Sequence, residues 1–85
     1  MDRDDIRNTL LDLLAVVDDE RDWSQEEVTE ETLLRDGLGL DSLQLTELLF
    51  EVEEKFNTRI TDEEARELRN AGDLITLIEK KLKAG

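Results

Sequence analysis

The chemistry that this chain can perform centres on one hydroxyl group, that of Ser42. The serine stands between Asp41 and Leu43, directly after a segment with two glycines, residues 37–40, and before a leucine-rich acidic segment. Glycines followed by Asp or Ser are typical of a loop that ends at the start of a helix. A serine at such a place has two possible uses: it caps the helix, or its exposed hydroxyl is the point where another group is attached.

The residue types that the chain lacks restrict what Ser42 can do. There is no histidine and no cysteine, so imidazole bases, thiolate nucleophiles, disulfides and zinc–thiolate sites are excluded. A Ser-His-Asp triad is therefore impossible within the chain. The acidic residues do not have the spacing of an EF-hand loop, and the chain is too small for a sugar-sized cleft between carboxylates. We therefore interpret Ser42 as a substrate for another enzyme and not as a catalytic nucleophile.

Length and composition predict one all-α domain over residues 1–85, because the chain is short, has no proline and is rich in leucine, glutamate and lysine. Apolar spacing predicts three main helices and one short helix, a four-helix bundle with a long first loop. The main helices are expected over about 4–17, 41–56 and from Asp73 to the C-terminal lysines, and the short helix over 61–69. Asp41 with Gln44 and Thr61 with Glu64 have the spacing of capping boxes. Residues 70–72 are expected to end the short helix, and Asp73 is expected to cap the last helix.

The first connection, residues 18–40, is longer and more apolar than an ordinary loop. We expect it to pack back onto the helices. Trp23 is then expected to cover the core, and the alternative is that it stacks on a ligand. Ser24 and Glu27 also have capping-box spacing, which predicts a turn of helix within 24–30.

The second predicted helix has two apolar stripes. The longer one is expected to face the core and consists of Leu45, Leu48, Leu49, Val52 and Phe56. Leu43 and Phe50 lie on the other stripe, which glutamates flank. They are exposed if the first stripe is buried, unless the long loop or the third helix covers them. An apolar centre surrounded by carboxylates is typical of a small protein-docking surface.

The net charge of −13 restricts the partners. It disfavours nucleic acid and anionic membranes and favours basic protein surfaces, although solubility alone is an alternative explanation. The charge is localised, because no basic residue occurs between Arg35 and Lys55. The N-terminal residues are too charged for a signal peptide, and no apolar run is long enough for a membrane span. We expect a cytoplasmic protein without membrane insertion.

An extended motif resembles the acyl carrier protein family. It reads Gly39-Leu40-Asp41-Ser42-Leu43, then Glu47-Leu48, then Glu53-Glu54-Lys55-Phe56. The pair Leu33-Leu34 before it and the run from Ile60 to Ala65 after it continue the likeness, which covers residues 33–68. Asp-Ser-Leu alone is a weak motif, but the whole string on a short acidic chain is specific.

The resemblance implies that Ser42 is the attachment site of a 4′-phosphopantetheine arm, added by a separate phosphopantetheinyl transferase. It implies a monomeric, non-catalytic carrier of acyl thioesters in fatty acid, polyketide or related biosynthesis, used by acyl-transferring and acyl-modifying enzymes with basic docking patches. The recognition residues that it implies are Asp41, Leu43, Glu47, Phe50, Glu51 and Glu54. The residues implied to line the core and the acyl-chain space are Leu45, Leu48, Leu49, Val52, Phe56, Ile60 and Leu68.

The chain departs from the family pattern at four positions. Gln44, Thr46 and Thr61 stand where many members have Asp, Val and Pro, and Leu45 stands where a smaller residue is common near the acyl tunnel. These differences indicate a specialised carrier with less room for a long acyl chain. An aminoacyl or D-alanyl carrier is an alternative within the family. The alternative of another class is an acidic helical adaptor without a prosthetic group, in which Ser42 only caps a helix.

Overall fold

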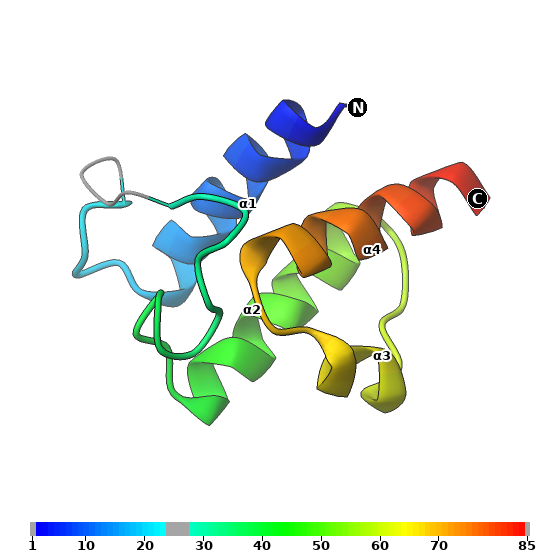
Figure 1. The fold of residues 1–85 in the computed structure, drawn as a ribbon. Helices are drawn as coiled ribbons and strands as arrows, with labels where there is room; N and C mark the ends of the chain where they lie inside the picture. Colours follow the sequence, from blue (N-terminus) through cyan, green and yellow to red (C-terminus); the bar gives the residue numbers. More distant parts are fainter. Residues whose placement is uncertain (1, 24–27, 85) are drawn as a thin grey trace.

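The structure, a computed structural model, describes residues 2–23 and 28–84. The helices are α1 (Arg3–Val17), α2 (Ser42–Lys55), α3 (Asp62–Glu67) and α4 (Ala71–Ala84) (Figure 1). No strand occurs within the described residues, where one isolated bridge joins Leu33 to Asn70. The all-α prediction with three main helices, one short helix and a long first connection is confirmed. None of the described helices has the length and apolar character that a membrane span needs.

Local capping explains where the first three helices begin. The Asp2 carboxylate accepts the N–H of Asp5 at the start of α1. Reciprocal capping boxes begin the next two helices, Asp41 with Gln44 for α2 and Thr61 with Glu64 for α3. Each box satisfies backbone N–H groups that the helix itself leaves without a partner. Both predicted capping boxes are therefore confirmed.

The start of α4 differs from the prediction. The sequence predicts that residues 70–72 are not helical and that Asp73 is the cap, but α4 already begins at Ala71. The side chain of Asn70 accepts the N–H of Asp73 at 2.8 Å, and the Asp73 carboxylate accepts the N–H of Asn70 at 3.3 Å. Gly72 lies inside the helix, where the backbone of the long connection packs closely against it. Its N–H donates to the Glu30 carbonyl at 2.8 Å, and a Cβ there would lie 2.9 Å from that oxygen.

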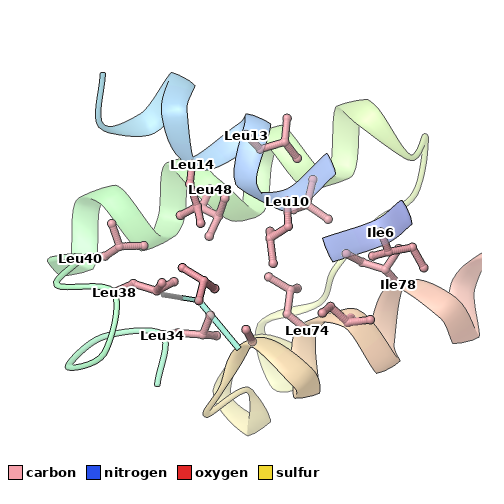
Figure 2. Close-up of a cluster of buried hydrophobic side chains, with 14 of the residues drawn as sticks. Ile6, Leu10, Leu13, Leu14, Leu34, Leu38, Leu40, Leu48, Leu74 and Ile78 are labelled. Atoms are coloured by element: carbon pink, nitrogen blue, oxygen red, sulfur yellow. The ribbon is translucent and has the colours of Figure 1, made fainter. Parts of the chain in front are cut away.

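The core lies where α1 packs against both α2 and α4. Figure 2 shows Ile6 and Ile78 meeting at one end of this cluster, while Leu14 and Leu48 lie toward the other end with Leu38. Burial of these aliphatic side chains is the main favourable term in the folding of such a small chain. The largest fully buried side chains are Ile6, Leu10, Leu14, Leu34, Leu38, Leu48, Val52, Leu74, Ile75 and Ile78.

The long connection completes the core, as the sequence predicts. Trp23, Val28, Leu34, Leu38 and Leu40 are buried. Its backbone is held by hydrogen bonds across the molecule, from the N–H of Leu34 to the Arg69 carbonyl at 2.9 Å and from the N–H of Ala71 to the Thr32 carbonyl at 2.8 Å. The connection therefore fixes the segment that leads into α2.

Trp23 covers the core, as predicted, and is 5% exposed. Its indole N–H donates to the Asp18 carbonyl at 3.0 Å, which satisfies the polar atom of a buried aromatic ring. The predicted turn of helix within 24–30 rests on Ser24 and Glu27, which lie outside the described residues. Residues 28 and 29 are not helical.

Candidate functional site

Ser42 is the first residue of α2, and its side chain is exposed. None of the described residues forms a hydrogen bond with its hydroxyl, while its backbone carbonyl accepts the Thr46 hydroxyl at 2.9 Å. The serine hydroxyl is thus presented to solvent at the positive end of the helix dipole. None of the described residues is hydrogen-bonded to this hydroxyl as a base would be.

Asp41 performs the capping that Ser42 would otherwise provide. The Asp41 carboxylate accepts the N–H of Gln44 at 2.8 Å, and the Gln44 side-chain oxygen accepts the N–H of Asp41 at 3.2 Å. The first turn of α2 therefore has its cap without the Ser42 hydroxyl. Of the two uses that the sequence allows for Ser42, the structure gives helix capping to its neighbour.

Close packing shapes the loop that leads to Ser42. Gly39 has a φ of 70°, in the left-handed region that favours glycine. The Arg21 guanidinium lies against it, 3.0 Å from where a Cβ of Gly39 would stand, and donates to the Leu38 carbonyl. The same guanidinium stacks over the Trp23 ring at 4.6 Å from its centre. The backbone before Ser42 is therefore tied to the start of the long connection, just after α1.

One exposed face of α2 follows Ser42. Leu43 and Phe50 are 69% and 62% exposed, so neither the long loop nor α3 covers them. Glu47 and Glu54 are exposed beside them, and Glu51 is half-buried. The spacing i, i+4, i+7, i+8 and i+11 places these side chains on one stripe of the helix. We call Leu43, Glu47, Phe50, Glu51 and Glu54, with Asp41 at the end, the docking stripe.

The glutamates of the docking stripe have no structural partner in the described part of the chain, where none of them forms an ion pair or a side-chain hydrogen bond. Glu53, on the same helix, differs because its carboxylate accepts the N–H of Ile60 at 3.0 Å. Glu64 differs too, since the Thr61 N–H and then the Lys81 ammonium lower the pKa of its carboxyl. The fold uses these two carboxylates, and that of Asp41 as the helix cap, and leaves the glutamates of the stripe available.

The residues expected to line an acyl-chain space fall into three places. Leu48 and Val52 are fully buried in the core, and Phe56 is half-buried against it. The half-buried Leu45 and Leu68 line a groove of about 460 Å³ between the long connection, α2 and α3. The half-buried Leu49 and Ile60 line a second groove, of about 180 Å³, beside Phe50.

Three arginines that no sequence motif indicates line the first groove. They are Arg35 from the long connection, Arg66 from α3 and Arg69 from the segment before α4. Their place in one groove depends on long-range packing, which short-range spacing does not show. Within the described residues no group of three or more Asp or Glu side chains is arranged to hold a metal ion.

Comparison with known proteins identifies the class of protein to which this chain is similar. The family model described as "Phosphopantetheine attachment site" matches residues 4–78. Among curated proteins, the acyl carrier protein of Wolinella succinogenes is 43% identical over 68 residues, 80% of this chain and 90% of the relative.

Solved structures agree with that class. The crystal structure of the acyl carrier protein of Thermotoga maritima matches with a TM-score of 0.84 at 30% identity, covering 99% of this chain and 94% of that one. The acyl carrier protein of Enterococcus faecalis, in a structure described in terms of its high thermal stability, matches with a TM-score of 0.66 at 25% identity, covering 95% and 99%.

The chain therefore belongs to the acyl carrier protein family, whose members are carriers and not catalysts. Membership implies a phosphopantetheine prosthetic group.

Proposed function

We propose that this protein carries acyl intermediates as thioesters on a 4′-phosphopantetheine arm attached to Ser42. The observation that supports this most is that Asp41, and not Ser42, caps the helix. Asp41 caps α2, and the exposed Ser42 hydroxyl has no hydrogen-bonding partner among the described residues. Modification of Ser42 would therefore cost the fold no hydrogen bond that the structure shows.

The residues around Ser42 fit a phosphate ester. The unpaired N–H groups and the dipole at the start of α2 favour a negative group there, while the Asp41 carboxylate opposes it and limits this gain. The arm supplies a thiol that holds the acyl group as a thioester. The chain itself presents the serine oxygen, and the transferase supplies the base that takes its proton.

The docking stripe fits partner enzymes with basic patches. Leu43 and Phe50 offer apolar contact, and the surrounding carboxylates attract a basic surface before contact is made. Because these carboxylates make no ion pairs with the described residues, a partner's Lys or Arg side chains do not have to displace a cation of this chain.

The proposal is tested by mass measurement of the intact protein after incubation with coenzyme A, Mg²⁺ and a phosphopantetheinyl transferase of broad specificity. We expect a gain of one phosphopantetheine group in the wild type and in Ser24→Ala, which alters the other serine of the chain. We expect no gain in Ser42→Ala. An unmodified wild type would favour the helical adaptor, and a gain that persists in Ser42→Ala would place the arm elsewhere.

A further inference from the structure

The groove between the long connection, α2 and α3 combines an apolar lining with an unusual charge. Leu45, Leu68 and Leu33 line it, and Leu33 is 47% exposed although it is apolar. Arg35, Arg66 and Arg69 line the same groove, together with one acidic residue, Asp36. The lining is therefore net positive in a chain whose net charge is −13.

Several other cations of the molecule have acidic partners among the described residues. Arg3 pairs with Glu30 and Glu79, Arg21 with Asp18 at 3.5 Å, and Lys81 with Glu64 at 2.9 Å.

In contrast, the guanidinium groups of Arg35, Arg66 and Arg69 form no ion pair or hydrogen bond with any residue that the structure describes. In a chain with 24 acidic residues, three unpaired arginines along one groove are available to an anionic ligand.

The groove lies close to the proposed attachment point. Leu45 follows Ser42 by three residues in α2, which is about one helical turn, or about 5 Å along the axis. An arm attached to Ser42 therefore starts next to the groove, and the arm has to fold back along the protein surface to bring the group at its free end into the groove. The bulk of Leu45 favours a short cargo over a long one.

We propose, on the basis of the proposed function, that this groove holds a short acyl cargo that ends in a carboxylate. The apolar part of such a cargo lies over Leu45 and Leu68. Its terminal carboxylate lies among the guanidinium groups, whose planar donor pairs match the two carboxylate oxygens. A neutral acyl chain of the same length would use the apolar lining and leave the arginines without a partner.

The test compares two cargoes of equal carbon number, hexanoyl and adipyl, on the full protein. Each is attached to the arm through an amide, so that it is not hydrolysed during measurement, and complete loading is verified by mass. The quantity measured is the Tm of the adipyl form minus that of the hexanoyl form. The variants are Arg66→Gln and Arg69→Gln, and the control is Arg59→Gln. Arg59 is exposed, lies outside the groove and gives the same change in net charge.

We expect Arg66→Gln and Arg69→Gln each to lower this difference by about 2–4 °C, and Arg59→Gln to leave it unchanged. Added salt should reduce the effect, because the contact is partly exposed. An equal difference in all four proteins, or an equal loss in Arg59→Gln, would overturn the inference while leaving the proposed function intact. Failure of the arm to load onto the wild type would overturn both.

Discussion

At the scale of residues, two neighbouring side chains divide tasks that one serine could have combined. Asp41 accepts the N–H of Gln44 and begins α2, while Ser42 directs its hydroxyl to solvent. A serine that both caps a helix and receives a phosphate ester would lose its capping geometry on modification. Separation of the two tasks lets the modified and unmodified proteins share one fold.

This division predicts different stability costs for the two positions. Asp41→Ala should lower the free energy of unfolding by about 1 kcal/mol, because it removes the N-cap of α2. Ser42→Ala should change it by less than about 0.5 kcal/mol, as expected for an exposed side chain that has no hydrogen-bonding partner among the described residues. Urea denaturation followed by circular dichroism measures both, with Asp41→Asn as the control that keeps a capping oxygen. A larger loss in Ser42→Ala than in Asp41→Ala would show that the serine is the cap.

At the scale of elements, α2 serves the fold with one face and leaves the other for partners. Leu48 and Val52 are buried in the core, whereas Leu43 and Phe50 are more than half exposed. Glu53 binds the N–H of Ile60 and so belongs to the fold, although it lies among the acidic residues of the same helix. Negative charge alone therefore does not identify the residues that are available to a partner.

Charge reversal on the docking stripe should slow association with a basic transferase. Glu47→Lys should reduce the association rate constant several-fold at low salt and make it less dependent on ionic strength, because long-range attraction acts before contact. Stopped-flow measurement over a range of salt concentrations tests this. Asp12→Lys is the control, since it makes the same change in charge at an exposed position of α1. Equal slowing in both variants would mean that only the net charge matters.

How much of these elements is predictable from sequence depends on the range of the contacts that fix them. Asp41 with Gln44 and Thr61 with Glu64 are capping boxes within a single turn, so spacing alone predicts them. The start of α4 has the same local signal, because Asn70 and Asp73 cap each other three residues apart. Gly72 hides this signal, because a glycine suggests a break, whereas here it is needed where the chain passes the Glu30 carbonyl. The arginine-lined groove escapes prediction for a different reason, since its arginines come together only in the folded chain.

At the scale of the whole molecule, net negative charge opposes the compact state, while a few ion pairs support it. The net charge is −13 at pH 7, and its magnitude decreases toward zero as the pH approaches the pI of about 4.2. Repulsion between carboxylates therefore decreases as the pH falls. The carboxyls of Glu30, hydrogen-bonded to Arg3, and of Glu64, bound by Thr61 and Lys81, have lowered pKa values and stay charged to a lower pH than an ordinary glutamate.

These opposing effects predict a maximum of stability in mildly acidic solution. The Tm should rise from pH 7 to about pH 5 as repulsion weakens. A carboxyl with a lowered pKa in the folded state stabilises the fold above its ordinary value of 4.5, and this contribution is lost as the pH falls through the folded-state pKa. The Tm should therefore fall again below about pH 4.5, and less steeply in Glu64→Gln, which does not titrate. Salt should raise the Tm at pH 7 and have little effect near the pI. A Tm that declines steadily from pH 7 to pH 5 would contradict the role given to repulsion.

The central claim is that Ser42 holds the arm, and peptide mass spectrometry tests it most directly. Cleavage after arginine and lysine releases residues 36–55, in which Ser42 is the sole serine and Thr46 the one other hydroxyl residue. After treatment with coenzyme A and a transferase, this peptide should gain one phosphopantetheine group, and fragmentation should place that group on Ser42. An unmodified peptide, or the group on Thr46, would contradict the claim.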